Sequence, residues 1–193
     1  MVVSKTEPVA LSPNQESKRR QVIEAARVVL ARDGVSGCTV RAVADASPLT
    51  KSAIHYYFRD IDEIVDLAVA AHLDAMLESL RDVAARHRDP DKRLRAVLDA
   101  YLAVFTDKPY AAFLWFEYWV TAGRRNRTDA VDDMLHKVHT LLVECTDDLP
   151  IDNADQTAHV LLSWLLGTVV QQRVRPRTTK ALAAEITGLL QAS

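Results

Sequence analysis

Apolar residues recur three and four positions apart over most of this 193-residue chain, which is the spacing of an α-helix with one buried face. The longest such stripe begins at Ile61 and continues to about His87, where Asp89-Pro90 breaks it. No stretch alternates apolar and polar residues in the way that is typical of a half-buried β-strand. The pattern therefore predicts an all-α protein with about nine helices.

Turn residues divide these helices into two groups. We expect residues 1–16 to form a flexible tail and residues 17–60 a three-helix head, whose first helix is capped by Ser17 and ended by Gly34. Residues 61–193 are predicted to form a body of six helices. Their approximate ranges are 61–87, 91–106, 109–123, 130–149, 153–174 and 178–191.

Residues 39–58 have the pattern of two short helices joined by a sharp turn. Thr39 can cap the first helix, and Pro48 stops it because the residue before a proline is pushed out of the α region. Thr50 then opens a second short helix, whose outward-facing residues are all hydrogen-bonding types. These residues are Lys51, Ser52, His55 and Tyr56. Two short helices with a polar second helix are typical of a motif that enters the major groove of DNA.

This spaced pattern resembles the DNA-binding domain of the TetR family of bacterial transcription regulators. The positions that match in kind are Thr39, Val43, Ala44, Leu49, Thr50, Ile54, Tyr57, Phe58 and the Glu63-Ile64 step. The match extends upstream through RRQVIEAARVVLARDGVSGCTV, so about a third of the chain carries it. The resemblance implies a head that binds double-stranded operator DNA. The residues expected to contact DNA are Thr39, Arg41, Thr50, Lys51, Ser52, His55, Tyr56 and Tyr57.

Three residues depart from the family pattern. Pro48 replaces the glycine that is usual in the turn, and a proline cannot supply the positive φ of a glycine. His55 stands where a tyrosine is common, and Ile61 stands where the family often places a lysine near a phosphate. We therefore expect a different angle between the two short helices and less reliance on that one phosphate contact.

The overall charge of −2 does not by itself suggest a partner, but the charge is unevenly distributed. Residues 1–60 contain nine Lys or Arg and six Asp or Glu, whereas residues 61–193 contain fifteen and twenty. A basic N-terminal region and an acidic remainder favour contact between the head and phosphates, with a different role for the body.

The chain has two cysteines, Cys38 and Cys145, and neither belongs to a CxxC pair. This usage predicts structural thiols in a reduced compartment, with a disulfide switch as the alternative. No signal peptide is recognisable, and the longest apolar run, Val160 to Val170, is about half the length that spans a bilayer. These features predict a soluble cytoplasmic protein.

The segment PYAAFLWFEYWVTAG, residues 109–123, is apolar almost all the way round, which predicts a helix buried on every side. It holds six of the twelve aromatic residues of the chain. One interpretation is plain core packing. The other is a pocket in which aromatic rings and one carboxylate hold an apolar ligand or a hydrophobic cation. The residues proposed for this pocket are Tyr101, Phe105, Trp115, Glu117, Tyr118 and Trp119.

The body also resembles the C-terminal domain of the BetI-like branch of the TetR family, which is named for choline-responsive control of betaine synthesis. The similar segments are LWFEYWVTAGRRNRTDAVDDMLHKVHTLLVE and SWLLGTVVQQRV. They cover most of residues 110–175, on a sparse pattern of aromatic residues and leucines. The resemblance implies a ligand-responsive body and leaves the ligand open.

The last two predicted helices carry more apolar surface than one small body needs, which predicts a two-fold, four-helix dimer interface. Its expected residues are Leu161, Leu162, Leu165, Val169, Leu182, Ile186 and Leu189. A two-fold dimer suits a palindromic operator, since its two recognition helices then enter successive major grooves about 34–36 Å apart.

We find no nucleophile–base motif of the GxSxG, HExxH or SxxK type, so we expect neither an enzyme nor a cofactor. His136 and His139 could share a metal, but solvent-exposed histidines are commoner and no metal site is predicted. The sequence thus indicates a homodimeric transcriptional repressor that a small-molecule inducer releases from its operator. The alternative is an all-α binding protein or enzyme whose N-terminal head is purely structural.

Overall fold

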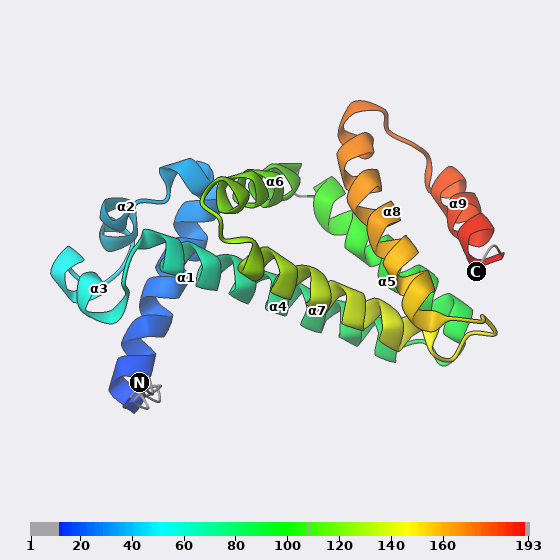
Figure 1. Cartoon of the computed structure of the whole chain (residues 1–193), viewed down its shortest axis with the longest axis horizontal. Helices are drawn as coiled ribbons and strands as arrows, with labels where there is room; N and C mark the ends of the chain where they lie inside the picture. The colour runs from blue at the N-terminus through cyan, green and yellow to red at the C-terminus, as the bar shows by residue number, and fades with distance from the viewer. Residues whose placement is uncertain (1–11, 108, 192–193) are drawn as a thin grey trace, which may run out of the picture. The chain divides into compact units, whose positions relative to one another are not determined.

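The computed structural model describes residues 12–107 and 109–191, and these residues form nine α-helices and no β-strand (Figure 1). The all-α prediction is therefore confirmed for the described chain. The helices are α1 (Pro13–Gly37), α2 (Val40–Asp45), α3 (Lys51–Tyr57), α4 (Ile61–Ala85), α5 (Pro90–Asp107), α6 (Pro109–Arg124), α7 (Thr128–Thr146), α8 (Ala154–Val174) and α9 (Thr179–Gln191).

The chain divides into two compact units, and the division falls inside α4, between Val69 and Ala70. We keep the name head for the unit that ends at Val69 and the name body for the unit that begins at Ala70. This division falls later than the boundary at residue 60 that the sequence suggests, because the first turns of α4 belong to the head unit. Ile64, Val65 and Ala68 on these turns are buried.

The first helix begins earlier than predicted. Ser12 is its N-cap, and Ser12 and Gln15 form a reciprocal capping box with Pro13 at the first helical position. Residues 13–16 are therefore part of the helix rather than of a tail, Ser12 caps it, and Ser17 lies inside it. The other predicted tail residues, 1–11, lie outside the described residues.

Gly34 interrupts the helix close to where the sequence predicts its end. Its backbone has φ 73° and ψ −175°, a conformation in which an ordinary side chain would be strained. The chain then makes one more turn, and the N–H of Cys38 donates to the carbonyl of Val35 at 3.1 Å. This kink lies inside α1, three residues before the helix ends at Gly37.

In the head, α2 and α3 pack against each other and against α1 (Figure 1). The apolar residues at this junction are buried, and they come from all three helices. They include Val22, Ala26, Val29, Val43, Ile54 and Phe58. Burial of this set fixes which side of each short helix faces inward, and hence which side remains exposed.

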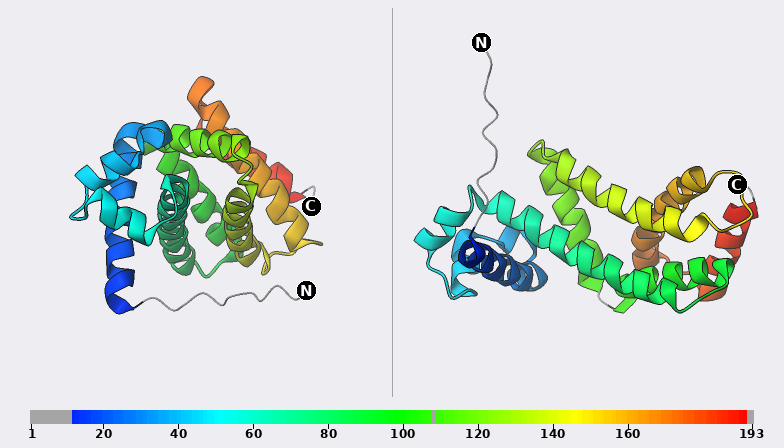
Figure 2. Two further views of the ribbon diagram at one scale, coloured as in Figure 1. Left: turned by 60° about the vertical axis from the view of Figure 1, so that its left-hand side comes forward. Right: turned by 90° about the horizontal axis from the view of Figure 1, so that it is seen from below.

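In the body, α8 packs against α5 and α7, and α9 packs against α8 (Figure 2). Its core contains leucines and valines of α5, α7 and α8, together with Tyr118 of α6. The prediction that α6 is buried on every side is wrong: Tyr110 is 51% exposed and Phe113 61%. One face of α6 packs against α5, α7 and α8, while Tyr110, Phe113 and Val120 are exposed.

Both cysteines are free and buried, with Cys38 in the head and Cys145 in the body. Burial raises the pKa of each thiol to about 11, so both stay protonated at neutral pH. No helix in the described residues is long and apolar enough to cross a membrane.

Candidate functional site

Each short helix of the head begins at a threonine cap, as predicted. Thr39 Oγ1 accepts the N–H of Ala42 at 3.2 Å, and Thr50 Oγ1 accepts the N–H of Ala53 at 3.3 Å. Both threonines are exposed. Each hydroxyl keeps its own proton for a further acceptor, so the two side chains can still donate to a phosphate.

The turn between α2 and α3 is closed by Ser47, which the sequence analysis did not single out. Ser47 Oγ accepts the N–H of Leu49 at 3.0 Å and donates to the carbonyl of Leu49 at 3.3 Å. Among the described residues, positive φ occurs only at Gly34 and Asn126, so the turn needs no glycine. Pro48 is exposed while Leu49 is buried, so the proline ring does not have to fit into the core of the head.

The second short helix, α3, has two distinct faces. Ile54 and the C-cap residue Phe58 are buried, and they hold the helix against the rest of the head. Lys51, Ser52 and His55 are exposed, and Tyr56 is 73% exposed. The ring of Tyr57 is part-buried and meets the ring of Tyr56 edge-on, with centroids 5.0 Å apart. The predicted separation of anchoring and outward-facing residues is therefore present.

Arg41 adds a cation to this exposed surface from α2. Its side chain is 79% exposed and lies 3.9 Å from Asp45, at the outer limit of an ion pair. Such an exposed pair contributes little stability, so the guanidinium remains available to another anion. Ile61, the first residue of α4, is part-buried. Both α2 and α3 therefore carry exposed cationic or hydrogen-bonding side chains, the types that contact phosphates.

In the body, the aromatic residues predicted to hold a ligand form two groups. On α5, the rings of Tyr101 and Phe105 have centroids 5.2 Å apart. On α6, the ring of Trp115 lies 6.3 Å from that of Trp119 and 6.2 Å from that of Tyr118. Tyr101 and Tyr118 are buried, and burial raises the pKa of the Tyr101 hydroxyl well above its usual value.

Two polar groups accompany the α6 rings. Glu117 lies between Trp115 and Trp119 in the sequence, and its side chain is part-buried. The indole Nε1 of Trp115 is buried and has no hydrogen-bond partner among the described residues. An unpaired buried N–H costs free energy, which an acceptor on a bound molecule would recover. This donor could not be predicted from the sequence, because a tryptophan in an apolar helix gives no sign of whether its N–H is paired.

Two open hollows of about 530 and 370 Å³ lie between α4 and α7 in the body. Arg81 lines both, and it forms an ion pair with Glu144 at 3.1 Å. None of the six predicted ligand residues lines either hollow. The aromatic groups and these hollows are therefore separate features of the body.

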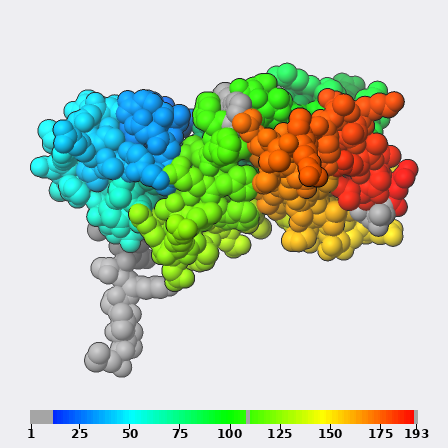
Figure 3. Space-filling view, turned by 90° about the horizontal axis from the view of Figure 1, so that it is seen from above, coloured from blue at the N-terminus to red at the C-terminus, as the bar shows by residue number. Residues whose placement is uncertain are grey.

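Figure 3 shows α8 (orange) and α9 (red) side by side on one face of the body. The residues predicted for the dimer interface, however, are mostly buried within the single chain. These residues are Leu161, Leu162, Leu165, Val169, Leu182 and Ile186, while Leu189 is part-buried. They stabilise the protomer and cannot supply the bulk of a surface between protomers. The apolar pattern of α8 has two sides, and the exposed side carries Val170 and Val174.

A polar network fixes α9 against α8. Trp164 Nε1 donates to Glu185 at 2.9 Å, and Arg177 donates to both oxygens of the same carboxylate at 2.8 and 2.6 Å. Arg177 also donates to the hydroxyl of the buried Thr168 at 3.0 Å. These contacts hold the segment between the two helices as well as the helices themselves.

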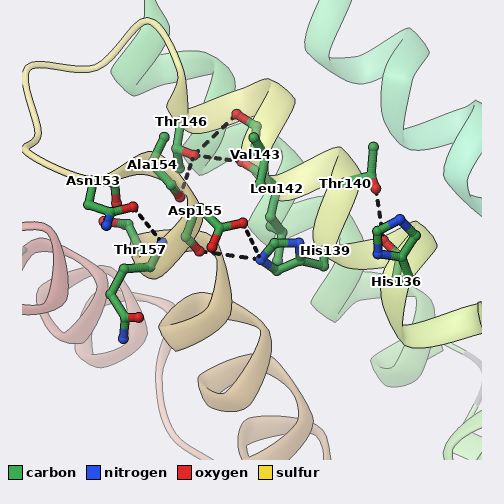
Figure 4. A network of polar contacts seen from close by, with 11 residues as sticks. His136, His139, Thr140, Leu142, Val143, Thr146, Asn153, Ala154, Asp155 and Thr157 are labelled. Carbon is green, nitrogen blue, oxygen red and sulfur yellow. Dashed lines mark hydrogen bonds and ion pairs between the residues drawn. The ribbon is translucent and has the colours of Figure 1, made fainter. Parts of the chain in front are cut away.

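The two histidines considered as metal ligands have different surroundings (Figure 4). His139 Nε2 lies 3.6 Å from Asp155 Oδ1 and 3.3 Å from the carbonyl of Asp155. His136 is exposed, and its carbonyl accepts the hydroxyl of Thr140 at 2.9 Å. In the part of the chain that the structure describes, no group of three or more His, Cys, Asp or Glu side chains could hold a metal ion.

Comparison with known proteins identifies the head. Residues 22–68 match the family described as "Bacterial regulatory proteins, tetR family", and this range includes all of α2 and α3. In Bacillus subtilis, the regulator PksA is 24% identical over 119 residues, which are 62% of this chain and 57% of PksA. The nicotine-responsive repressor HdnoR of Paenarthrobacter nicotinovorans is 28% identical over 107 residues, 55% of each chain. The chain thus spans little more than half the length of these two relatives.

Other comparisons extend over most of the chain. BetI of Cronobacter sakazakii is 23% identical over 184 residues, 89% of each chain. The crystal structure of a regulator from Pseudomonas aeruginosa PAO1 is 21% identical, with a TM-score of 0.73 over 94% of this chain and 91% of that one. The multidrug binding protein EbrR complexed with ethidium is 23% identical, with a TM-score of 0.69 over 90% of this chain and 98% of that one. Residues 22–68 therefore form a domain of the tetR family of bacterial regulatory proteins, and the chain as a whole shares its all-α fold with solved regulators.

Proposed function

We propose that this protein is a transcriptional repressor that binds a palindromic operator as a homodimer and is released by a small-molecule inducer. The exposed face of α3 is the observation that carries the proposal. Lys51, Ser52 and His55 are exposed there, on a helix whose other face is anchored by Ile54. Side chains of these types can hydrogen-bond to base edges in the major groove. Thr39, Thr50, Tyr56 and Tyr57 would hold phosphates and so fix the register of the helix.

The alternative of an enzyme or carrier with a structural head receives no support from the relatives. PksA, HdnoR and BetI are all named as transcriptional regulators or repressors. A purely structural head would also have no need of an exposed lysine, histidine and tyrosine on one short helix. A protein that acts on operator DNA would work in the cytoplasm, in agreement with the expectation from the sequence.

The inducer that fits the α5 and α6 rings is an apolar molecule or a hydrophobic cation with one hydrogen-bond acceptor. The ring faces of Trp115 and Trp119 can attract a cation, and Glu117 adds a carboxylate. The unpaired Nε1 of Trp115 can donate to the acceptor. Two relatives agree with this class of ligand: HdnoR is named as nicotine-responsive, and EbrR has been crystallised with ethidium, an aromatic cation. Similarity to BetI along most of the chain supports placement in the BetI-like branch.

Release from DNA would use α4, because α4 is one uninterrupted helix that begins in the head and continues into the body. We propose that the inducer favours a position of α4 that separates the two heads of the dimer beyond the spacing of successive major grooves. Only a ligand that binds this state more tightly than the DNA-binding state can drive the change.

Dimerisation would use the outer faces of α8 and α9. Val170 and Val174 are exposed on α8 and suit an apolar seam between two copies. The buried leucines and Ile186 that the sequence pointed to would support this seam from inside each protomer.

The experiment that tests the proposed function is a titration of the full chain against a labelled duplex carrying the DNA upstream of its own gene. We expect saturable binding that is at least a thousandfold tighter than binding to poly(dI-dC), as is usual for specific regulators at physiological salt. Equal affinity for the two DNAs would contradict the proposal.

A further inference from the structure

Arg19 of α1 joins three elements of the head. One guanidinium nitrogen, Nη1, donates to the main-chain carbonyl of Tyr57, the last residue of α3. The other, Nη2, donates to Oε1 of Glu63 in the first turn of α4 at 3.0 Å. The guanidinium carbon lies 4.2 Å from the centre of the Phe58 ring, which places the cation against the ring face.

Glu63 completes the junction from α4. Its second oxygen, Oε2, accepts the N–H of Arg59 at 2.9 Å, within the three-residue connection between α3 and α4. Asp60 Oδ1 accepts the N–H of Glu63 at 2.8 Å and so caps α4. One carboxylate therefore ties α1, the connection and α4 together, while Arg19 adds the end of α3.

These contacts are not those of an ordinary surface ion pair. The Arg19 and Glu63 side chains are only 22% and 19% exposed, so water screens them less than it screens a fully exposed pair. Burial raises the pKa of Glu63, but the hydrogen bonds from the Arg59 N–H and from Arg19 outweigh it and leave the pKa below its usual value. Glu63 is thus ionised at neutral pH and can hold both donors.

We propose that Arg19 and Glu63 form a clamp that positions α3 for DNA and couples its orientation to α4. The inference rests on the proposed DNA-binding function, in which α3 is the recognition helix. Helix α3 has only seven residues, and few of them are buried. The Arg19 cation satisfies one of the carbonyls that the end of a helix leaves unpaired, at the end where the helix dipole favours a cation. Arg19 is a positioning residue, since it acts on DNA through α3.

The chain offers a matched control in the same helix. Arg27 donates to Glu24 at 2.8 Å, three residues away within α1. Glu63→Gln and Glu24→Gln each remove one carboxylate charge from a pair with an arginine of α1. They differ in whether the pair spans several elements or lies within a single helix.

The test combines hydrogen exchange of the free protein with DNA titration of the full chain. In Glu63→Gln, we expect the amides of residues 53–58 to exchange about tenfold faster than in the wild type, because the clamp contributes hydrogen bonds to charged groups. The amides of the α5 and α7 cores should be unchanged, which separates a local effect on α3 from general destabilisation. Glu24→Gln should match the wild type throughout.

Binding to the duplex from upstream of the protein's own gene should weaken about tenfold in Glu63→Gln and by less than twofold in Glu24→Gln. Arg19→Lys keeps the charge but loses the fork of donors, and it should fall between wild type and Glu63→Gln in both measurements. Should Glu63→Gln fail to fold, Arg19→Lys carries the same comparison.

The two hypotheses fail in different ways. If the wild type does not prefer the duplex to poly(dI-dC), the proposed function is wrong, and the exchange data still test the clamp. If residues 53–58 exchange at the same rate in wild type, Glu63→Gln and Arg19→Lys, the clamp is refuted. If the wild type prefers the duplex to poly(dI-dC), equal affinity of these three proteins for the duplex also refutes the clamp.

Discussion

Ser47 and Leu49 close the turn between α2 and α3 by a two-way exchange, in which Ser47 Oγ accepts the Leu49 N–H and donates to the Leu49 carbonyl. Leu49 is thereby held in the core of the head, with Pro48 exposed between the two residues. Pro48 replaces the glycine that is usual in this family, and no residue of the turn has a positive φ. The Ser47 hydroxyl closes the turn by hydrogen bonds, so the turn does not need the left-handed backbone that a glycine allows.

This turn gives the first prediction. Ser47→Ala should lower the free energy of unfolding by about 1 kcal/mol, because the N–H of Leu49 loses its acceptor. Ser52→Ala is the matched control, since Ser52 is exposed on α3 and should change stability by less than about 0.5 kcal/mol. Urea denaturation of the full-length variants measures both. Identical midpoints for Ser47→Ala and wild type would show that the turn does not depend on the hydroxyl.

The second prediction concerns the thiols. Because burial raises the pKa of Cys38 and Cys145 to about 11, neither forms an appreciable amount of thiolate below about pH 9. Iodoacetamide at pH 7.5 should therefore leave both thiols unmodified in the folded protein and modify both in urea, as measured by mass spectrometry. Rapid alkylation of either thiol in the folded state would revive the alternative of a redox switch.

The third prediction concerns the aromatic residues of α6. With ethidium as the probe, Trp119→Ala should weaken binding severalfold, since a ring of a cation–π site contributes about 0.5–2 kcal/mol. Glu117→Gln should weaken ethidium binding while sparing a neutral aromatic ligand. Trp164→Phe is the control, because the indole N–H of Trp164 already donates to Glu185 and Trp164 is not one of the predicted ligand residues. Quenching of tryptophan fluorescence reports binding, and a wild type that no candidate ligand quenches would assign these rings to the core.

The fourth prediction separates the two sides of α8. Val174 is 78% exposed, so Val174→Asp should leave the protomer folded and produce monomers by sedimentation. Leu165 is buried within the protomer, so Leu165→Asp should instead unfold the body. If Val174→Asp and Val170→Asp both remain dimers, the interface lies elsewhere.

Local signals predicted most of the fold. Thr39 and Thr50 act as helix caps in the structure, as predicted, because a cap depends only on a side chain and a backbone N–H a few residues away. The choice of Ser17 over Ser12 was wrong because both are capping residues, and only the Ser12–Gln15 box with Pro13 distinguishes them. Helix boundaries elsewhere agree with the prediction to within about three residues.

The features of the candidate sites were harder to predict from the sequence than the helices. The apolar pattern of α6 and α8 does not tell whether the protomer itself buries a residue, so the exposure of Phe113 and the burial of Leu161 within the protomer could not be predicted from it. Arg19 and Glu63 are 44 positions apart, and their contact depends on how α1, α3 and α4 pack. The unpaired Nε1 of Trp115 likewise depends on its neighbours in space. Long-range packing, rather than local propensity, decides each of these.

The central claim is that the exposed face of α3 reads DNA sequence, and Lys51→Ala tests it most directly. Lys180→Ala is the control, because Lys180 is an exposed lysine of α9 and its removal changes the net charge equally. Binding of both variants is measured against the duplex from upstream of the protein's own gene and against poly(dI-dC). We predict that Lys51→Ala loses about 1–3 kcal/mol of specific binding per base contact and loses part of its preference for the duplex, while Lys180→Ala behaves as the wild type. Unchanged affinity and unchanged sequence preference in Lys51→Ala would contradict the account.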